Sequence, residues 1–182
     1  MSKAVCVYCG SSSRVAQIYW DTARDLGAML ARQGYSLVFG GGRIGLMGAV
    51  ANAAMDAGGY VLGVIPELLR DRELAMEDVD ELIVTRDLHE RKETMIQRAD
   101  AFVALPGGFG TWEEIIETLT HKLLGFHAKP CIILNQNGYY APLLEMFERA
   151  YREGFAREEH RCLYRVAESV AEVLKLLERE MP

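Results

Sequence analysis

Residues 101–124, AFVALPGGFGTWEEIIETLTHKLL, join a short apolar run, a glycine loop and a longer amphipathic stretch. The apolar run 101–105 predicts a buried strand, because it is short and is ended by a proline and two glycines. Residues 111–124 predict a helix, because their apolar side chains recur every three or four positions. A strand that passes through a glycine loop into a helix is typical of a parallel α/β sheet.

The rest of the chain repeats this alternation of strand and helix patterns. Further strands are predicted at residues 4–8, 36–39, 60–65, 81–85, 131–134 and, more weakly, 162–166. Further helices are predicted at residues 18–33, 44–57, 88–98, 140–152 and 168–180. The strand runs are apolar on both faces, as in parallel sheets covered by helices. We therefore expect one α/β domain over residues 1–182, a doubly wound parallel sheet with helices on both faces, in which ligands bind beyond the carboxyl ends of the strands.

Composition and charge narrow the class of protein. The chain has 182 residues and a formal net charge of −6, with half of its residues hydrophobic and a quarter charged. This balance is typical of one globular domain and argues against nucleic-acid binding, which needs an excess of Lys and Arg on one face. No apolar stretch approaches the roughly 20 residues of a membrane span, and the start of the chain lacks the apolar core of a signal peptide. We expect a cytoplasmic protein without membrane or nucleic-acid partners.

The four cysteines, Cys6, Cys9, Cys131 and Cys162, are expected to be reduced in the cytoplasm. Cys6 and Cys9 have CxxC spacing, but a zinc site needs a second pair of ligands. A redox CxxC usually opens a helix, whereas Cys6 falls within a predicted strand. The sequence therefore predicts buried thiols and no metal.

Two glycine loops follow predicted strands. Gly40-Gly41-Gly42-Arg43-Ile44-Gly45-Leu46-Met47-Gly48 follows strand 36–39, and Pro106-Gly107-Gly108-Phe109-Gly110-Thr111 follows strand 101–105. Glycines let the backbone approach a ligand closely, and the helix that follows each loop directs free N–H groups and its positive dipole end at that ligand. Either loop alone is compatible with a simple tight turn. Together they favour a nucleotide or sugar phosphate, held by Gly41 and Gly42 of the first loop and by all six residues of the second.

The first loop also allows NAD binding as a minor alternative. Gly40, Gly42 and Gly45 match the dinucleotide fingerprint, although that motif usually follows the first strand rather than the second. Glu67, which follows the next strand, would then hold the ribose of NAD. The loop has no Gly-Lys-Ser/Thr ending, which excludes a Walker A motif.

The predicted helix 111–124 carries charge beside the second loop. Its apolar stripe, which we expect to pack on the sheet, consists of Trp112, Ile115, Ile116, Leu119 and Leu123. Glu114, Glu117 and His121 share the opposite side. Glu117 and His121 are equally compatible with a solvated face. Glu114 lies in the first predicted turn, where a carboxylate either contacts what the loop holds or pairs with the helix dipole.

The predicted helix 88–98 carries two adjacent cations. It is expected to start at Asp87, because Asp87 and Glu90 have the spacing of a capping box. Lys92 falls on its apolar stripe and Arg91 on the edge of that stripe. A lysine can extend its amine to water from such a position. The two cations nevertheless indicate an anionic neighbour, and Arg91 is suited to neutralise a phosphate or to hold a carboxylate in place.

These motifs together resemble the signature of the LOG ("lonely guy") family, the cytokinin riboside 5′-monophosphate phosphoribohydrolases. The resemblance rests on HERK at 89–92, RADAF at 98–102 and PGGFGTWEE at 106–114, which completes the family hallmark PGGxGTxxE. It runs nearly end to end and takes in CGSS at 9–12, the loop 40–48, GFHAKP at 125–130 and NGYY at 137–140.

The resemblance implies a homodimeric, Rossmann-like enzyme that needs no metal or redox cofactor. It implies that Arg91 and Glu114 are the catalytic pair, and that loop 106–111 contacts the phosphate of the nucleotide. The implied reaction hydrolyses the N-glycosidic bond of AMP or N6-prenyl-AMP to free base and ribose 5-phosphate. Members are often labelled lysine decarboxylases, but no lysine of this sequence has a context that argues for a Schiff base with pyridoxal phosphate.

Several points stay open at the level of sequence. The base is adenine or an N6-prenylated adenine, whose tail would need an apolar pocket such as one near Met47. The leaving base takes its proton from Asp87, His121 or water. The apolar residues at 119–124 and 140–147 are compatible with dimer contacts and equally with the core. A non-enzymatic nucleotide-binding module and a carrier similar to molybdenum-cofactor carriers remain alternatives to the enzyme.

Overall fold

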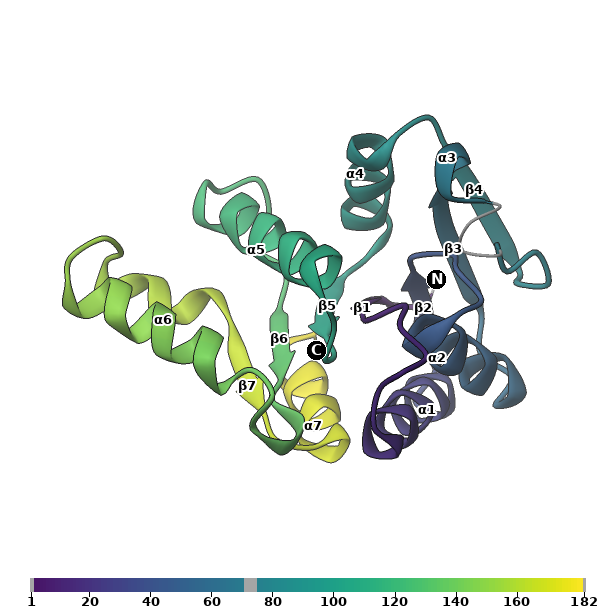
Figure 1. Cartoon of the computed structure of the whole chain (residues 1–182), viewed down its shortest axis with the longest axis horizontal. Coiled ribbons are helices and arrows are strands. Elements are labelled where there is room, and N and C mark those ends of the chain that lie inside the picture. The colour runs from purple at the N-terminus through teal and green to yellow at the C-terminus, as the bar shows by residue number, and fades with distance from the viewer. Residues whose placement is uncertain (1, 71–74, 182) are drawn as a thin grey trace.

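The core of the protein is one sheet of seven strands in the order β4-β3-β2-β1-β5-β6-β7 (Figure 1). The computed structural model describes residues 2–70 and 75–181. Every neighbouring pair of strands is parallel. The strands are β1 Ala4–Tyr8, β2 Ser36–Phe39, β3 Val61–Pro66, β4 Glu81–Thr85, β5 Ala101–Ala104, β6 Cys131–Leu134 and β7 Arg165–Ala167.

The chain winds outward from β1 in both directions. Strands β2, β3 and β4 follow on one side of β1, and β5, β6 and β7 follow on the other. Val7 of β1 pairs with Phe39 of β2, and Tyr8 of β1 pairs with Ala104 of β5, so the carboxyl ends of these three strands are neighbours. This is the switch point of a doubly wound sheet, where ligands bind. The predicted Rossmann-like α/β fold is confirmed.

Helices cover both faces of the sheet (Figure 1). One face is covered by α1 Gln17–Arg32, α2 Gly45–Asp56 and α7 Val170–Glu180, and the other by α4 Leu88–Arg98, α5 Phe109–Leu123 and α6 Ala141–Arg152. A short helix that the sequence did not predict, α3 Glu67–Arg70, follows β3. Within residues 2–70 and 75–181, no helix combines the length and the apolar character that crossing a membrane requires.

The central strand contributes side chains to both layers, because successive residues of a strand point to opposite faces. Val5 and Val7 join the core beneath α1, α2 and α7, whereas Cys6 and Tyr8 join the core beneath α4 and α5. All four side chains are buried. Burial on both faces explains why the strand runs of the sequence are continuously apolar.

The seventh strand is shorter and later than predicted. Cys162 belongs to a 3-10 helix, Glu158–Leu163, and β7 begins only at Arg165. Arg165 donates from Nη1 to the carbonyl oxygen of Cys162 at 3.2 Å, which ties this turn to the strand. As an edge strand paired with β6 alone, β7 is stable with a ladder of three residues.

The cysteines differ in exposure. All four are free thiols; Cys6, Cys9 and Cys131 are buried, whereas Cys162 is exposed, so the prediction of a buried thiol is wrong for Cys162. Burial, reinforced by the nearby charge of Glu114, raises the pKa of the Cys6 and Cys9 thiols well above the ordinary value. In the part of the chain that the structure describes, no group of three or more His, Cys, Asp or Glu side chains is placed to hold a metal ion.

These environments predict a selective thiol titration. At pH 8 a chromogenic disulfide should react rapidly with the exposed Cys162 alone. Only a thiolate is nucleophilic, and the raised pKa keeps the buried thiols of Cys6, Cys9 and Cys131 protonated at that pH. All four thiols should react in denaturant, and Cys162→Ser should remove the rapid phase. Rapid reaction of two or more thiols in the native protein would contradict the structure.

Candidate functional site

A cleft of about 340 Å³ lies beyond the carboxyl ends of β1, β2 and β5. Its walls come from the segment after β1, the turn after β2, helix α4 and the start of α5. The residues that line it are Val7, Tyr8, Cys9, Gly10, Ser11, Gly40, Met47, Leu69, Leu88, Arg91, Met95, Gly108, Phe109, Gly110, Thr111 and Glu114. The cleft therefore occupies the switch point of the sheet, where the fold predicts a ligand.

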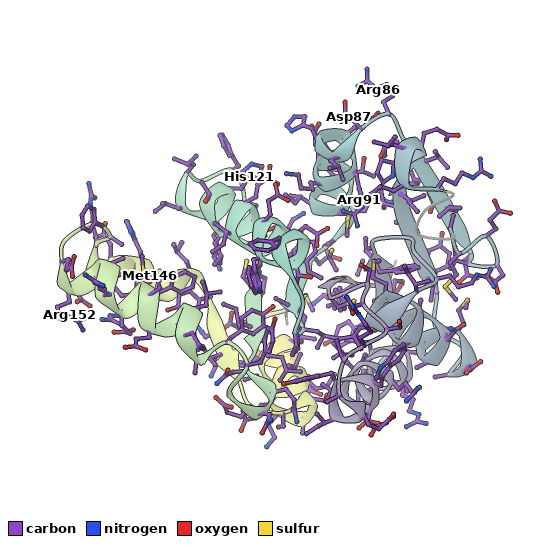
Figure 2. The ribbon with its side chains drawn as sticks, viewed as in Figure 1. Arg86, Asp87, Arg91, His121, Met146 and Arg152 are labelled. Atoms are coloured by element: carbon purple, nitrogen blue, oxygen red, sulfur yellow. The ribbon has the colours of Figure 1, made fainter. Side chains whose placement is uncertain are left out.

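Helix α4 begins where the sequence predicts. The carboxylate of Asp87 accepts a hydrogen bond from the backbone N–H of Glu90 at 2.9 Å and caps the helix. The other half of the predicted capping box is wrong, because the Glu90 carboxylate accepts from the N–H of Arg86, at 2.8 Å, rather than from that of Asp87. This cap sets where α4 begins. One turn later, Arg91 points toward the strand ends, whereas Asp87 stays exposed (Figure 2).

Arg91 is buried and bonded on three sides. Its Nη1 donates to Oε1 of Glu114 at 2.6 Å, in an ion pair whose two side chains are each 9% exposed. Its Nε donates to the carbonyl oxygen of Val64 at 3.0 Å, and its Nη2 to that of Gly40 at 3.4 Å. The guanidinium is thereby tied to the ends of two strands and to α5, which holds the carboxylate of Glu114 in one place at the floor of the cleft.

Gly40 leaves the space that this guanidinium occupies. A Cβ at this position would lie 2.2 Å from Nη2 of Arg91 and 2.8 Å from the sulfur of Met47. Any side chain here would therefore displace either Arg91 or Met47. The sequence predicts binding by the next two glycines and gives no sign of this role for Gly40, because glycine spacing alone does not reveal a contact with a residue 51 positions later.

Helix α5 turns Glu114 inward, contrary to the prediction from its apolar stripe. The helix starts at Phe109 rather than at residue 111, so Glu114 lies in the second turn and not in the first. Its buried side carries Thr111, Glu114, Ile115, Thr118 and Leu119.

Three members of the predicted stripe are outside the core: Trp112, Ile116 and Leu123 are 36%, 37% and 44% exposed. The buried side of α5 can contain polar groups because those groups are hydrogen-bonded. Thr118 donates to the carbonyl oxygen of Glu114 at 2.8 Å and shares a hydrogen bond with the hydroxyl of Tyr8 at 2.9 Å. Pairing of this kind removes the cost of burying polar atoms, and apolar periodicity does not detect it.

The second glycine loop faces the cleft with its backbone. Gly108 precedes the first turn of α5, where no side chain caps the helix. A Cβ on Gly108 or Gly110 would meet no protein atom within 4 Å, and neither residue has a positive φ. Neither glycine is thus required by the protein's own packing, which is typical of a backbone left open for a ligand. Gly107 differs, since its Cβ would lie 2.1 Å from Oγ1 of the buried Thr111.

The first glycine loop supports the cleft more than it lines it. Gly41 has a φ of 75° and its carbonyl oxygen accepts from the N–H of Met76 at 2.9 Å, and Gly42 forms a bridge with Ala75. Gly45, with a φ of 62°, lies against the backbone of Ser11. Gly41 and Gly42 are absent from the described lining of the cleft, to which this loop contributes Gly40 and Met47.

The remaining predicted residues lie outside this cleft as the structure describes it. Lys92 forms ion pairs with Glu113 and with Glu117, the latter at 2.7 Å. His121 stacks edge-on with Phe126 at 5.4 Å between ring centroids, on the side of α5 away from the cleft. Figure 2 shows His121 on α5 and Arg91 on α4. The backbone N–H of Glu90 lowers the pKa of Asp87, which makes this carboxyl group a poorer proton donor at neutral pH.

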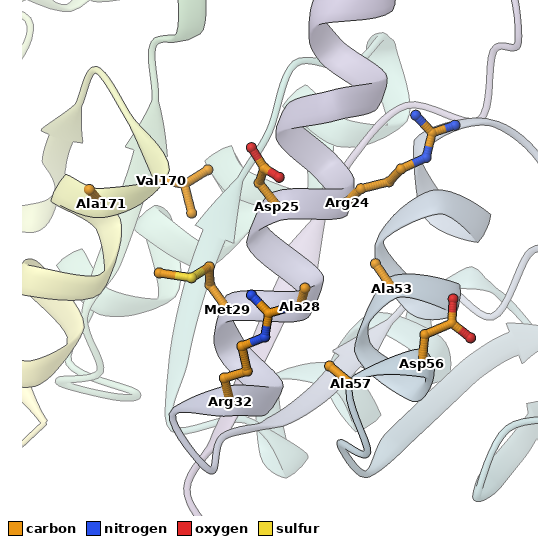
Figure 3. Close-up of a pocket in the computed structure, with 10 residues that line it drawn as sticks. All are labelled: Arg24, Asp25, Ala28, Met29, Arg32, Ala53, Asp56, Ala57, Val170 and Ala171. Atoms are coloured by element: carbon orange, nitrogen blue, oxygen red, sulfur yellow. The ribbon is translucent and has the colours of Figure 1, made fainter.

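A larger hollow of about 560 Å³ lies among α1, α2 and α7 (Figure 3). It is lined by charges of both signs, Arg24, Asp25, Arg32 and Asp56, and otherwise mostly by small side chains. Every lining residue is on one of these helices or directly follows one, and none lies at a strand end. The smaller cleft is therefore the better candidate for a ligand site, because it combines strand ends, a helix N-terminus and a buried ion pair.

Comparison with known proteins identifies the family. The family model described as "Possible lysine decarboxylase" matches residues 47–177. Cytokinin riboside 5′-monophosphate phosphoribohydrolase LOG4 of Arabidopsis thaliana is 46% identical over 178 residues, which cover 98% of this chain and 83% of that protein. The phosphoribohydrolase LOG of Oryza sativa subsp. japonica is 44% identical over 180 residues, which cover 99% and 74%.

Solved structures share the fold at lower identity. The Moco carrier protein of Chlamydomonas reinhardtii has a TM-score of 0.76 and 25% identity, covering 100% of this chain and 98% of that one. The molybdenum cofactor binding protein of Rippkaea orientalis has a TM-score of 0.77 and 22% identity, covering 100% and 99%, and this likeness shows the fold alone. The extent of the match to the family model and to the plant sequences decides the assignment: this chain belongs to the LOG family.

Proposed function

We propose that the protein hydrolyses the N-glycosidic bond of adenosine 5′-monophosphate or its N6-prenylated form, releasing the base and ribose 5-phosphate. The observation that carries this proposal is the carboxylate of Glu114, fixed by Arg91 at the floor of a cleft beside the open amides of a helix N-terminus. Relatives at 42–46% identity are named cytokinin riboside 5′-monophosphate phosphoribohydrolases.

Glu114 supplies the negative charge that this reaction requires. Cleavage of a glycosidic bond passes through a cation-like sugar with charge on its anomeric carbon and ring oxygen. A carboxylate held next to that carbon stabilises the charge and orients the attacking water. Arg91 holds the carboxylate in position through its bonds to Val64 and Gly40, so no rearrangement is needed as the charge develops.

The start of α5 receives the phosphate in this proposal. The N–H groups of Gly108, Phe109, Gly110 and Thr111 stand at the N-terminus of the helix, where the dipole favours an anion. All four residues line the cleft together with Glu114. Binding at this end places the sugar between the phosphate site and the carboxylate.

Apolar side chains complete the cleft where the base would lie. Met47, Leu69, Leu88 and Met95 line it together with Arg91. A planar purine and an N6-prenyl tail both gain from contact with such thioether and aliphatic groups. Asp87 is a helix cap and His121 is outside the cleft, so we assign the proton on the leaving base to solvent water.

Two competing functions have less support. The label of lysine decarboxylase does not suit this cleft, because no lysine is among its described lining residues. A carrier of the molybdenum-cofactor type would share the fold, but the carrier proteins named above are at most 25% identical to this chain, against 46% for a phosphoribohydrolase.

We further propose that two copies associate through the outer side of α5. Its exposed apolar residues form one surface with the segment that follows: Phe109 is 85% exposed, Trp112 36%, Ile116 37%, Leu124 63% and Phe126 73%. Large exposed apolar patches mark interfaces. Phe109 belongs both to this surface and to the cleft, so a second copy seated here would also shield the cleft from water.

We also propose that the protein is cytoplasmic, in keeping with its four free thiols.

One prediction of this proposal concerns turnover. Incubation with AMP or with N6-isopentenyl-AMP should release free base, and chromatography will show which nucleotide reacts faster. Glu114→Gln should lower kcat by about 100-fold or more, because the uncharged amide no longer stabilises the sugar cation. Glu93→Gln makes the same chemical change at an exposed position of α4 and should leave kcat unchanged. Full activity of Glu114→Gln would refute the assignment.

A second prediction concerns association. Sedimentation equilibrium should give twice the chain mass of 20.4 kDa for the wild type. Ile116→Glu should give the monomer mass, because a carboxylate within an apolar interface is left without a partner. Ile18→Glu makes the same substitution at an exposed site of α1 on the other face of the sheet and should remain dimeric. A monomeric wild type, or a dimeric Ile116→Glu variant, would exclude this interface.

A further inference from the structure

Three successive carbonyl oxygens at the back of the second glycine loop are each bonded to a donor from elsewhere in the chain. The hydroxyl of Tyr140 donates to the oxygen of Leu105 at 2.7 Å. The N–H of Gly10 donates to the oxygen of Pro106 at 3.2 Å. The hydroxyl of Tyr139 donates to the oxygen of Gly107 at 2.5 Å. Each bond holds one peptide plane of the loop in a fixed orientation.

The orientation of these peptide planes determines whether an anion in the cleft meets N–H groups or carbonyl oxygens. In a trans peptide, the C=O of one residue and the N–H of the next point in opposite directions. The structure contains no cis peptide bond among its described residues. Fixing the oxygen of Gly107 therefore also fixes the N–H of Gly108, the residue that opens α5 and lines the cleft. If this plane rotated, a carbonyl oxygen would replace an N–H and would repel the ligand.

A tight turn presents the two tyrosines to the loop. Asn137 and Gly138 have φ values of 55° and 71°, which reverse the chain just before Tyr139. The backbone N–H of Tyr140 donates to Oδ1 of Asn135 at 2.8 Å, which fixes the end of the turn. The rings of Tyr139 and Tyr140 then pack edge to face at 5.1 Å between centroids. Neither tyrosine lines the cleft, and nothing in the proposed reaction requires either one to touch the nucleotide.

We infer that Tyr139 is a positioning residue for the phosphate site: its hydroxyl holds the Gly107–Gly108 peptide with the N–H toward the ligand. This inference deepens the proposed function and rests on it, since the ligand it concerns is the phosphate of the nucleotide. Tyr139 suits a test better than Tyr140, because it is half-buried whereas Tyr140 is fully buried within the core.

The test compares Tyr139→Phe with the wild type. Loss of one hydrogen bond that orients an amide should weaken binding of the phosphate by about tenfold. We expect KM for AMP to rise by this factor while kcat changes by less than about twofold. Calorimetry should show the same loss of affinity for ribose 5-phosphate and unchanged affinity for adenine, which lacks the phosphate. Tyr60→Phe removes a hydroxyl that bonds Glu81, far from the cleft, and should behave as the wild type.

Two results would overturn the inference. One is unchanged affinity of Tyr139→Phe for ribose 5-phosphate. The other is an equal loss of affinity for adenine, which would indicate general loosening of the fold and would appear also as a lower Tm. If the wild type binds ribose 5-phosphate but hydrolyses neither nucleotide, the proposed reaction fails while the binding comparison still decides the role of Tyr139.

Discussion

The other groups of the site are arranged around the buried ion pair between Arg91 and Glu114. Removing two charges from water costs several kcal/mol for each ion, and a buried pair recovers this cost only with good geometry and further hydrogen bonds. Arg91 obtains those bonds from Val64 and Gly40, at the ends of β3 and β2, in addition to the carboxylate. One side chain thus joins α4, α5, strand β3 and the turn after β2, beside the switch point of the parallel sheet.

The neighbouring residues are constrained by this pair. Gly40 lacks a side chain because the guanidinium fills that space. Asp87 caps α4 one turn before Arg91 and so sets where this helix begins. On α5, the hydroxyl pair of Tyr8 and Thr118 allows a polar side of the helix to pack against the sheet. The carboxylate and the loop amides, which act on the anomeric carbon and on the phosphate in the proposed reaction, therefore stand on one helix.

The strands and most of the helices could be predicted from the sequence because their signals are local. Strands β1, β2, β4 and β6 match the predicted limits, since each is a short apolar run between turn residues. Glu114 was found from its position behind a glycine loop, Arg91 from its position at the edge of an apolar helix stripe, and both from a family motif. The packing of α5 was not predictable from periodicity, because its buried side contains Glu114 and Thr118 and its apolar residues Trp112 and Ile116 face outward. Gly40 and the tyrosines at 139 and 140 act through contacts between distant segments, which one sequence does not display.

The buried pair is tested most directly by a double-mutant cycle on the free energy of unfolding in urea, with Arg91→Met, Glu114→Leu and the double variant. Each single substitution leaves a buried charge without its partner and should cost about 3–5 kcal/mol, and the double variant should cost at least about 2 kcal/mol less than the sum. The same cycle on the solvent-exposed pair of Arg149 and Glu153 should give a coupling below about 1 kcal/mol. Additivity within about 0.5 kcal/mol at Arg91 and Glu114 would contradict a coupled buried pair at the centre of the site.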